Sequence, residues 1–326
     1  MGDWSHHGGR IAAAARAFGG QAEDWLDLST GINPIAWPGA ASLAIDWRGL
    51  PDDAALRALE EAAAAMFEAD PAFVCALPGT EIGLRLIGQA IGEGAAVHVA
   101  PAYRTHGAML GGTAPIAAEE VAAERAAGRT VILANPNNPD GRLIAADTIG
   151  ALADGAGWLI VDEAFADAHP AASVAGQVEA GRRLIVFRSF GKFFGLAGVR
   201  LGFVIAPPAV LAAVRALLGS WPVSVAALAI GTAAYRDHRW IAETRAALPA
   251  RAAALDGVLA RHGLGAGGAC PLFRLVERDE AGPLFARLAR HAILTRPFDH
   301  DPRWLRFGVP GDAAALERLD RALALG

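Results

Sequence analysis

The residue most suited to covalent chemistry is Lys192, the only lysine among the 29 basic residues of this 326-residue chain. It lies in a glycine-rich segment, residues 188–200 (RSFGKFFGLAGVR), between two apolar runs, and two phenylalanines follow it. An apolar setting disfavours the ammonium form and lowers the pKa, so that the free amine can attack a carbonyl. Ser189 and Arg200 offer a hydroxyl and a guanidinium to a phosphate. The competing interpretation is a surface lysine in a flexible loop.

Asp162 is a second candidate, because it follows directly on the apolar run 158–161 (WLIV). A carboxylate at the end of a buried strand is unfavourable unless it meets a cation or a metal ion. It could pair with a protonated pyridine nitrogen and so keep a cofactor ring electron-poor. It could instead cap a helix, or bind Mg²⁺ as in a nucleotide site, although the chain has no GxxxxGKS/T segment to support that last role.

Two further segments combine turn signals with polar side chains. Residues 134–141 (ANPNNPDG) have the Asn and Pro density of a turn, and an Asn amide held there could donate to a ligand phenolate. Residues 78–81 (PGTE) open a helix after a strand, so free N–H groups and the Thr80 hydroxyl would form an anion site. Ordinary turn formation and an ordinary helix N-cap are the alternatives.

Composition excludes several classes of protein. The formal charge is −5, which argues against nucleic acid or an anionic membrane as a partner. Apolar residues form 53% of the chain and charged residues 19%, which is typical of a well-packed core rather than of disorder. Cys75 and Cys270 match no metal-ligand spacing, so we expect no metal site. Without a signal sequence or an apolar stretch of about 18 residues, a cytoplasmic protein is expected.

The candidate residues follow short apolar runs that predict buried strands. Such runs are typical of a mostly parallel sheet covered by helices on both faces, an α/β fold. Ligands of these sheets bind beyond the carboxyl ends of the strands, where the candidates stand. The runs are residues 73–77, 97–100, 130–134, 158–161, 184–187 and 201–206.

The pattern changes after Pro207-Pro208, where long Ala/Leu/Arg helices begin and short strands follow from about residue 270. We therefore expect a large domain over residues 41–210. Residues 1–40 and 211–326 are expected to form a smaller α+β domain.

Taken together, the motifs resemble the fold-type I pyridoxal-phosphate enzymes, the class I/II aminotransferase superfamily. Six family motifs occur in the family order over residues 79–202. They are Gly79-Thr80-Glu81, Pro101-Ala102-Tyr103, residues 135–141, Asp162-Glu163-Ala164-Phe165, Ser189-Phe190-Gly191-Lys192 and Arg200-Leu201-Gly202.

The resemblance implies a role for each residue and a homodimeric enzyme. Lys192 would bind the cofactor covalently and move protons, Asp162 would pair with the pyridine nitrogen, and Tyr103 would stack on the ring. Asn138 would hydrogen-bond the ring 3′-oxygen. The residues that would hold the cofactor phosphate are Gly79, Thr80, Glu81, Ser189 and Arg200. The sequence departs from the family pattern at Phe165 and Leu50, where many relatives have tyrosine.

The flanking segments decide the reaction. Residues 7–16 (HGGRIAAAAR), 25–34 (WLDLSTGINP) and 293–299 (ILTRPFD) resemble the threonine-phosphate decarboxylases of cobalamin biosynthesis. That resemblance implies that Arg306 binds the substrate carboxylate, and that His7, Asn33 and Arg296 bind the substrate phosphate. The alternatives are a bystander histidine, a turn residue and a surface ion-pair partner.

Two other functions remain open. A histidinol-phosphate-type aminotransferase would share nearly all of the cofactor residues and would also take a phosphorylated substrate. A chain of this fold could instead be a non-catalytic partner of the amide synthase that attaches aminopropanol.

Overall fold

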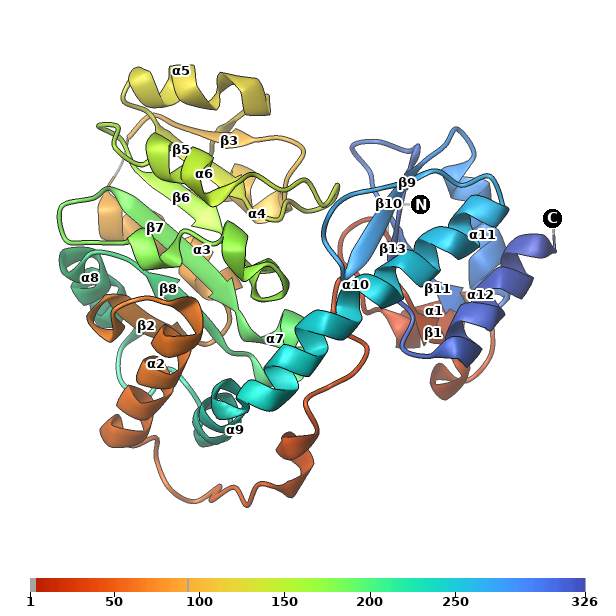
Figure 1. Cartoon of the computed structure of the whole chain (residues 1–326), viewed down its shortest axis with the longest axis horizontal. Coiled ribbons are helices and arrows are strands. Elements are labelled where there is room, and N and C mark those ends of the chain that lie inside the picture. The colour runs from red at the N-terminus through yellow and green to blue at the C-terminus, as the bar shows by residue number, and fades with distance from the viewer. Residues whose placement is uncertain (1–3, 93, 326) are drawn as a thin grey trace. The chain divides into compact units, whose positions relative to one another are not determined.

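The computed structural model describes residues 4–92 and 94–325, which form two compact units (Figure 1). The larger unit comprises residues 36–138 and 142–242. The smaller unit comprises residues 1–35, 139–141 and 243–326.

A seven-stranded sheet forms the centre of the described part of the larger unit. Five strands, β7, β6, β5, β3 and β4, run parallel, and β8 is antiparallel to both of its neighbours, β7 and β2. The parallel strands are apolar along their length because both faces are covered. In sheet order the strands are β2 (Val74–Leu77), β8 (Gly202–Ile205), β7 (Leu184–Ser189), β6 (Leu159–Asp162), β5 (Thr130–Ala134), β3 (Ala96–Val99) and β4 (Ala114–Ile116).

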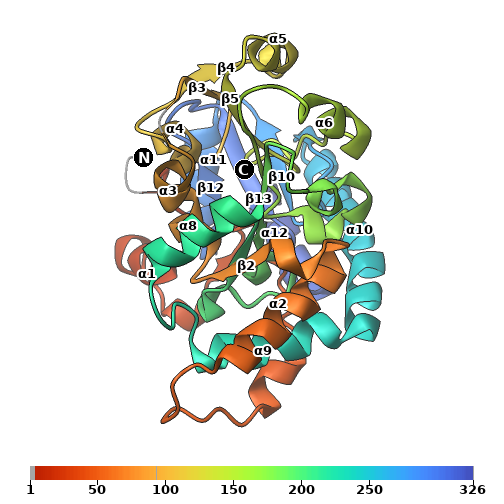
Figure 2. The ribbon, with the colours of Figure 1, turned by 90° about the vertical axis from the view of Figure 1, so that its left-hand side faces the viewer.

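Helices cover both faces of this sheet, which confirms the expected α/β class. On one face, Ile185 and Phe187 pack with side chains of α3 (Thr80–Ile91) and α8 (Pro208–Leu218). On the other face, Phe203 contacts Phe67 of α2 and Tyr235 of α9. Figure 2 shows α2 and α9 side by side. The bounds of the remaining helices are α2 (Asp53–Phe67), α4 (Arg104–Ala108), α5 (Val121–Ala126), α6 (Ala146–Leu152), α7 (Phe190–Phe193) and α9 (Val225–Arg236).

The structure places residues 211–242 in the larger unit, whereas the sequence placed a boundary near residue 210. The physical reason is the aromatic core around Tyr235, which is 1% exposed and contacts the rings of Phe190, Phe194 and Phe203. Helix α9 therefore completes the core of the large sheet instead of starting the small domain.

The smaller unit is an α+β structure built on a four-stranded antiparallel sheet. Its strand order is β12 (Arg296–Pro297), β13 (Trp304–Gly308), β10 (Phe273–Glu277) and β9 (Ala266–Gly267). Two short strands pair in parallel, β1 (Leu26–Asp27) with β11 (Ile293–Leu294), which joins the N-terminal segment to this unit. The helices of the smaller unit are α1 (Ile11–Phe18), α11 (Ala281–Arg290), α12 (Ala313–Ala324) and most of α10 (His238–Arg261).

Residues 4–92 and 94–325 have three features that bear on the class of protein. No helix among them is both long and apolar enough to cross a membrane. Nor do these residues include a group of three or more His, Cys, Asp or Glu side chains placed to hold a metal ion. Cys75 and Cys270 are buried, and burial raises the pKa of each thiol to about 12, so neither thiol is a nucleophile near neutral pH.

Candidate active site

The candidate residues of the larger unit meet at one edge of the sheet. Strands β5, β6 and β7 are parallel and in register, with Ala134 opposite Asp162 and Asp162 opposite Phe187. Their carboxyl ends therefore lie side by side. The turn at residues 135–138, Asp162 and the segment from Ser189 onward all leave the sheet at this edge.

Lys192 lies in a helical turn rather than in an open loop. Strand β7 continues directly into α7, where Lys192 is half-buried and its Nζ lies 5.9 Å from the centre of the Phe165 ring. Gly191 allows this turn, because a Cβ there would lie 2.7 Å from the Cα of Ala197. Phe165 is 6% exposed, so the amine faces a ring without a hydroxyl at the position where many relatives have tyrosine.

Asp162 binds a buried histidine that the sequence analysis missed. Its Oδ2 lies 2.9 Å from Nε2 of His106, and its Oδ1 accepts from the N–H of Ala164 at 3.1 Å. His106 is fully buried, and its Nδ1 has no hydrogen-bond partner among the described residues. A protonated imidazole would bury an unsatisfied N–H, so we assign the neutral tautomer that donates from Nε2. Together with the Ala164 N–H, this bond fixes the orientation of the Asp162 carboxyl group.

Tyr103 and His106 stand three residues apart at the start of α4, and their rings meet edge-on at 5.9 Å. The i, i+3 spacing of Tyr103 and His106 is the sequence signal that could have identified His106, because such residues share one face of a helix. The Tyr103 hydroxyl donates to Oε2 of Glu81 at 3.0 Å, and burial raises the pKa of Tyr103. Glu81 also accepts from Thr105 and Arg85, so its carboxylate is engaged in holding α4 on α3. A phosphate ligand at the start of α3 would therefore contact the backbone N–H of Glu81 and not its carboxylate.

The start of α3 has the form of a phosphate cradle. Gly79 has φ +88°, and a Cβ there would lie 2.6 Å from Nη2 of Arg200. Gly202, which pairs with Ser189 across the sheet, would place a Cβ 2.6 Å from the N of Thr80. The Arg200 guanidinium therefore lies beside Gly79, and Thr80 lies beside the strand end that carries Ser189, so that a guanidinium, helix N–H groups and two hydroxyl-bearing residues are neighbours. This donor set fits a phosphate dianion.

The three asparagines of the turn at residues 135–138 have different roles. Asn135 donates to the carbonyl of Ile144 and accepts from its N–H. Asn137 donates to the carbonyl of Pro101 at 2.9 Å. These two asparagines fix the turn, as the turn interpretation predicted. Asn138, which is half-buried, follows them at the strand edge.

Arg306 lies in the smaller unit on β13 and is 6% exposed. Its Nη2 donates to the carbonyl of Ser29 at 3.1 Å, and its Cζ lies 4.8 Å from the centre of the Phe273 ring. Burial lowers the pKa of Arg306, and the neighbouring charge of Arg296 lowers it further. Because a guanidinium keeps its proton, this setting favours a bound anion, such as a carboxylate.

Arg296 faces Arg306 directly, because the two are paired across β12 and β13. Its Nη2 donates to the carbonyls of Ser5 and His6, both at 2.9 Å, and so fixes the segment that carries His7. His7 itself is exposed. The structure therefore brings Arg296 and Arg306 together at the small sheet, with the backbone just before His7 bound to Arg296.

The N-terminal segment lies close against residues 29–30 of the same unit. Gly9 donates its N–H to Oγ of Ser29 at 2.8 Å, and a Cβ on Gly8 would overlap the carbonyl of Ser29. Only glycine allows this approach at residue 8. Asn33 is 3% exposed, and its Oδ1 accepts from the N–H of Ile35 at 3.0 Å, a bond typical of a turn residue.

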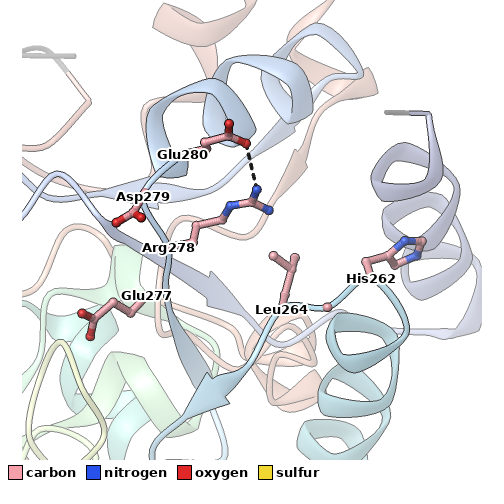
Figure 3. Close-up of a pocket in the computed structure, with 7 residues that line it drawn as sticks. His262, Leu264, Glu277, Arg278, Asp279 and Glu280 are labelled. Carbon is pink, nitrogen blue, oxygen red and sulfur yellow. Dashed lines mark hydrogen bonds and ion pairs between the residues drawn. The ribbon is translucent and has the colours of Figure 1, made fainter.

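A separate hollow of about 440 Å³ opens on the smaller unit (Figure 3). None of the predicted site residues lines it. Three of its lining residues are acidic, and Glu280 accepts from Arg278 at 3.0 Å. This excess of negative charge disfavours a phosphorylated, carboxylate-bearing substrate. The lining residues are His262, Gly263, Leu264, Glu277, Arg278, Asp279 and Glu280.

Comparison with known proteins defines the class. The family described as aminotransferase class I and II matches residues 116–323. A solved structure of histidinol-phosphate aminotransferase from Sinorhizobium meliloti in complex with pyridoxal-5'-phosphate has a TM-score of 0.83 at 23% identity, over 96% of this chain and 93% of its own. The chain belongs to the aminotransferase class I and II family and is an enzyme of that family.

Two curated relatives carry a more particular name. A threonine-phosphate decarboxylase from Sinorhizobium sp. is 43% identical, over 98% of this chain and 97% of its own length. A threonine-phosphate decarboxylase from Pseudomonas aeruginosa is 38% identical, over 97% and 96% of the two chains. These relatives confirm the resemblance that the flanking segments indicated.

Proposed function

We propose that this chain is a pyridoxal-phosphate-dependent lyase that decarboxylates L-threonine O-3-phosphate to (R)-1-amino-2-propanol phosphate, a step of cobalamin biosynthesis. One observation carries the proposal: the match to two relatives named threonine-phosphate decarboxylase extends over nearly the whole chain, at 43% and 38% identity. The pair of facing arginines at the small sheet supports it, because this substrate carries both a carboxylate and a phosphate.

The residues present fit pyridoxal phosphate. Gly79, Thr80, Ser189 and Arg200 offer a phosphate cradle at the start of α3, and Asp162 is buried at the strand edge with its carboxyl group oriented by His106. Lys192 supplies the one lysine amine of the chain. When bound, this cofactor supplies an electron sink for the electron pair left at Cα when a bond to Cα breaks.

Each side chain of the site then has a separate role in the reaction. Arg306 holds the substrate carboxylate, while Arg296, His7 and Asn33 bind the phosphate. Lys192 Nζ delivers a proton to Cα. This proton takes the place of the carboxylate that leaves as CO₂. Asp162 keeps a proton on the pyridine nitrogen, and Asn138 and Tyr103 orient the ring. We also propose that the enzyme is a homodimer, as the family resemblance implies. Leu50, at the position of a family tyrosine, is 67% exposed in the segment before α2.

Incubation of the enzyme with threonine phosphate and the cofactor tests the reaction. Stoichiometric CO₂ release without a keto acid supports the decarboxylase. Strict dependence on 2-oxoglutarate, with no CO₂, would refute it and favour a histidinol-phosphate-type aminotransferase.

Lys192→Ala is the matched control. We expect it to abolish both CO₂ release and the visible absorption band that borohydride removes from the wild-type enzyme. If it kept full activity in a reconstituted pathway, the chain would instead be a non-catalytic partner of the amide synthase.

A further inference from the structure

A cluster of buried charges lies directly behind the strand edge described above. Arg188 is 1% exposed, and its Nη1 donates to Oε2 of Glu163 at 2.8 Å. Its Nη2 pairs with Asp167, which is 2% exposed. The charge cluster, as we call Arg188, Glu163 and Asp167, is fully within the larger unit.

The cluster joins the ends of two neighbouring strands (Figure 1). Glu163 is the residue after Asp162 at the end of β6. Arg188 is the residue before Ser189 at the end of β7, four positions ahead of Lys192. Glu163 and Arg188 are therefore each next in the chain to a residue of the proposed cofactor site, with their side chains buried in the core, and Asp167 follows five residues after Asp162.

Further contacts hold both partners in one orientation. Glu163 accepts from Oγ of Ser173 at 2.6 Å and from the N–H of Val174 at 2.7 Å. Arg188 also donates to Oγ of Ser173 at 2.9 Å, and its Cζ lies 4.5 Å from the centre of the Phe67 ring. Burial alone would lower the pKa of Arg188, but the two carboxylates raise it, so the guanidinium is held as a cation.

A buried ion cluster of this kind is a poor explanation of stability alone. Removing charges from water is so unfavourable that apolar replacements of similar volume are often neutral or stabilising for folding. Arg188 Nε and the Tyr235 hydroxyl also lack a hydrogen-bond partner among the described residues, which is unfavourable in a core of aromatic rings. The geometry therefore points to a role at the adjacent site.

We propose that Arg188, Glu163 and Asp167 are positioning residues that fix Asp162 relative to Ser189 and Lys192. This inference rests on the proposed function only for the identity of the bound cofactor. A displacement of about 1 Å at a reacting group can lower the rate about 100-fold. The planar guanidinium of Arg188 at the end of β7 donates to Glu163 at the end of β6 and to Asp167 in the turn that follows, and the point charge of a lysine has no such fixed fork.

The test uses Arg188→Lys and Glu163→Gln in the holoenzyme, with Arg125→Lys as the matched control. Arg125 is 3% exposed in the same unit, and it donates to the carbonyls of Leu152 and Ala153, outside the strand edge that carries the site. Tyr235→Phe is a second control, because it changes the same core without removing a charge.

For Arg188→Lys and Glu163→Gln we expect kcat to fall about 100-fold with KM within about twofold. The visible circular dichroism of the bound cofactor should also weaken, since it reports how the ring is held. Arg125→Lys and Tyr235→Phe should leave both readouts unchanged, even where they lower Tm. Wild-type kcat and visible circular dichroism in Arg188→Lys and Glu163→Gln would overturn the proposal.

Hydrogen exchange of the cofactor-free chains separates this inference from the proposed function. We expect faster exchange at residues 160–165 and 186–192 in Arg188→Lys, and no change there in Arg125→Lys. Unchanged exchange at both strand ends would refute the positioning role, whatever the cofactor. If the wild-type chain showed no cofactor absorption band, the proposed function would be refuted but the positioning role would not. The exchange result by itself decides whether the cluster holds the strand ends.

Discussion

The bond between His106 and Asp162 makes the most direct prediction about the site. His106→Met removes the imidazole that contacts Asp162 and puts an apolar side chain of similar length in a fully buried position. His106→Gln keeps an N–H donor that can reach the same carboxylate oxygen. The two variants therefore differ mainly in the hydrogen bond, and less in the volume of the core.

The magnitude follows from the burial of the pair. Asp162 is 6% exposed, and its other contact, with the N–H of Ala164, is at 3.1 Å. A hydrogen bond to a charged group contributes about 1.5–3 kcal/mol, which corresponds to roughly 10-fold to 150-fold in a rate or binding constant. We expect His106→Met to lose this factor in kcat/KM and in cofactor affinity. His106→Gln, which restores a donor, should lose less than about tenfold.

Two assays measure the outcome: absorbance titration of the cofactor-free chain with pyridoxal phosphate, and the rate of CO₂ release. His98→Gln is the control. His98 lies on β3 of the same sheet, and its Nδ1 contacts Thr113 at 2.7 Å instead of Asp162. If His106→Met stays within twofold of the wild type in both assays, Asp162 does not depend on His106. The reasoning from the 2.9 Å contact would then be wrong.

Three other changes test separate parts of the structure. Arg306→Lys, which loses the planar fork, should lower kcat/KM by about 10-fold to 100-fold and leave the cofactor absorption band unchanged; a shifted band would contradict its place in substrate binding. Gly8→Ala would push the N-terminal segment off the Ser29 carbonyl, so the KM for threonine phosphate should rise about tenfold with unaltered cofactor affinity, and an unchanged KM would remove His7 from the site. Burial raises the pKa of Glu60 above 4.5, so its ionisation disfavours the folded state as pH rises through that raised pKa. Glu60→Gln, which keeps an acceptor for the Ala76 N–H, should therefore gain stability relative to the wild type in urea unfolding as the pH rises above 4.5, and a difference that does not change with pH would refute this.

The sequence by itself predicted where along the chain the chemistry takes place. Lys192 is the only lysine, and Asp162 ends an apolar run, so a buried parallel strand had to bring it to a sheet edge where ligands bind. Apolar runs of four to six residues predicted the α/β sheet for the same physical reason, because only strands covered on both faces are apolar throughout. The change of pattern after Pro207-Pro208 predicted the short strands from about residue 270.

Tertiary structure alone decided what supports these residues. His106 stands 56 positions from Asp162, and Glu163 stands 25 positions from Arg188, so no local pattern could pair them. Tyr235 placed α9 in the larger unit because its ring contacts four phenylalanine rings from three other segments. Periodicity shows that a residue is buried but not which residues surround it, because those contacts depend on how distant segments pack. That packing set the partners of Asp162, the charge cluster and the domain boundary.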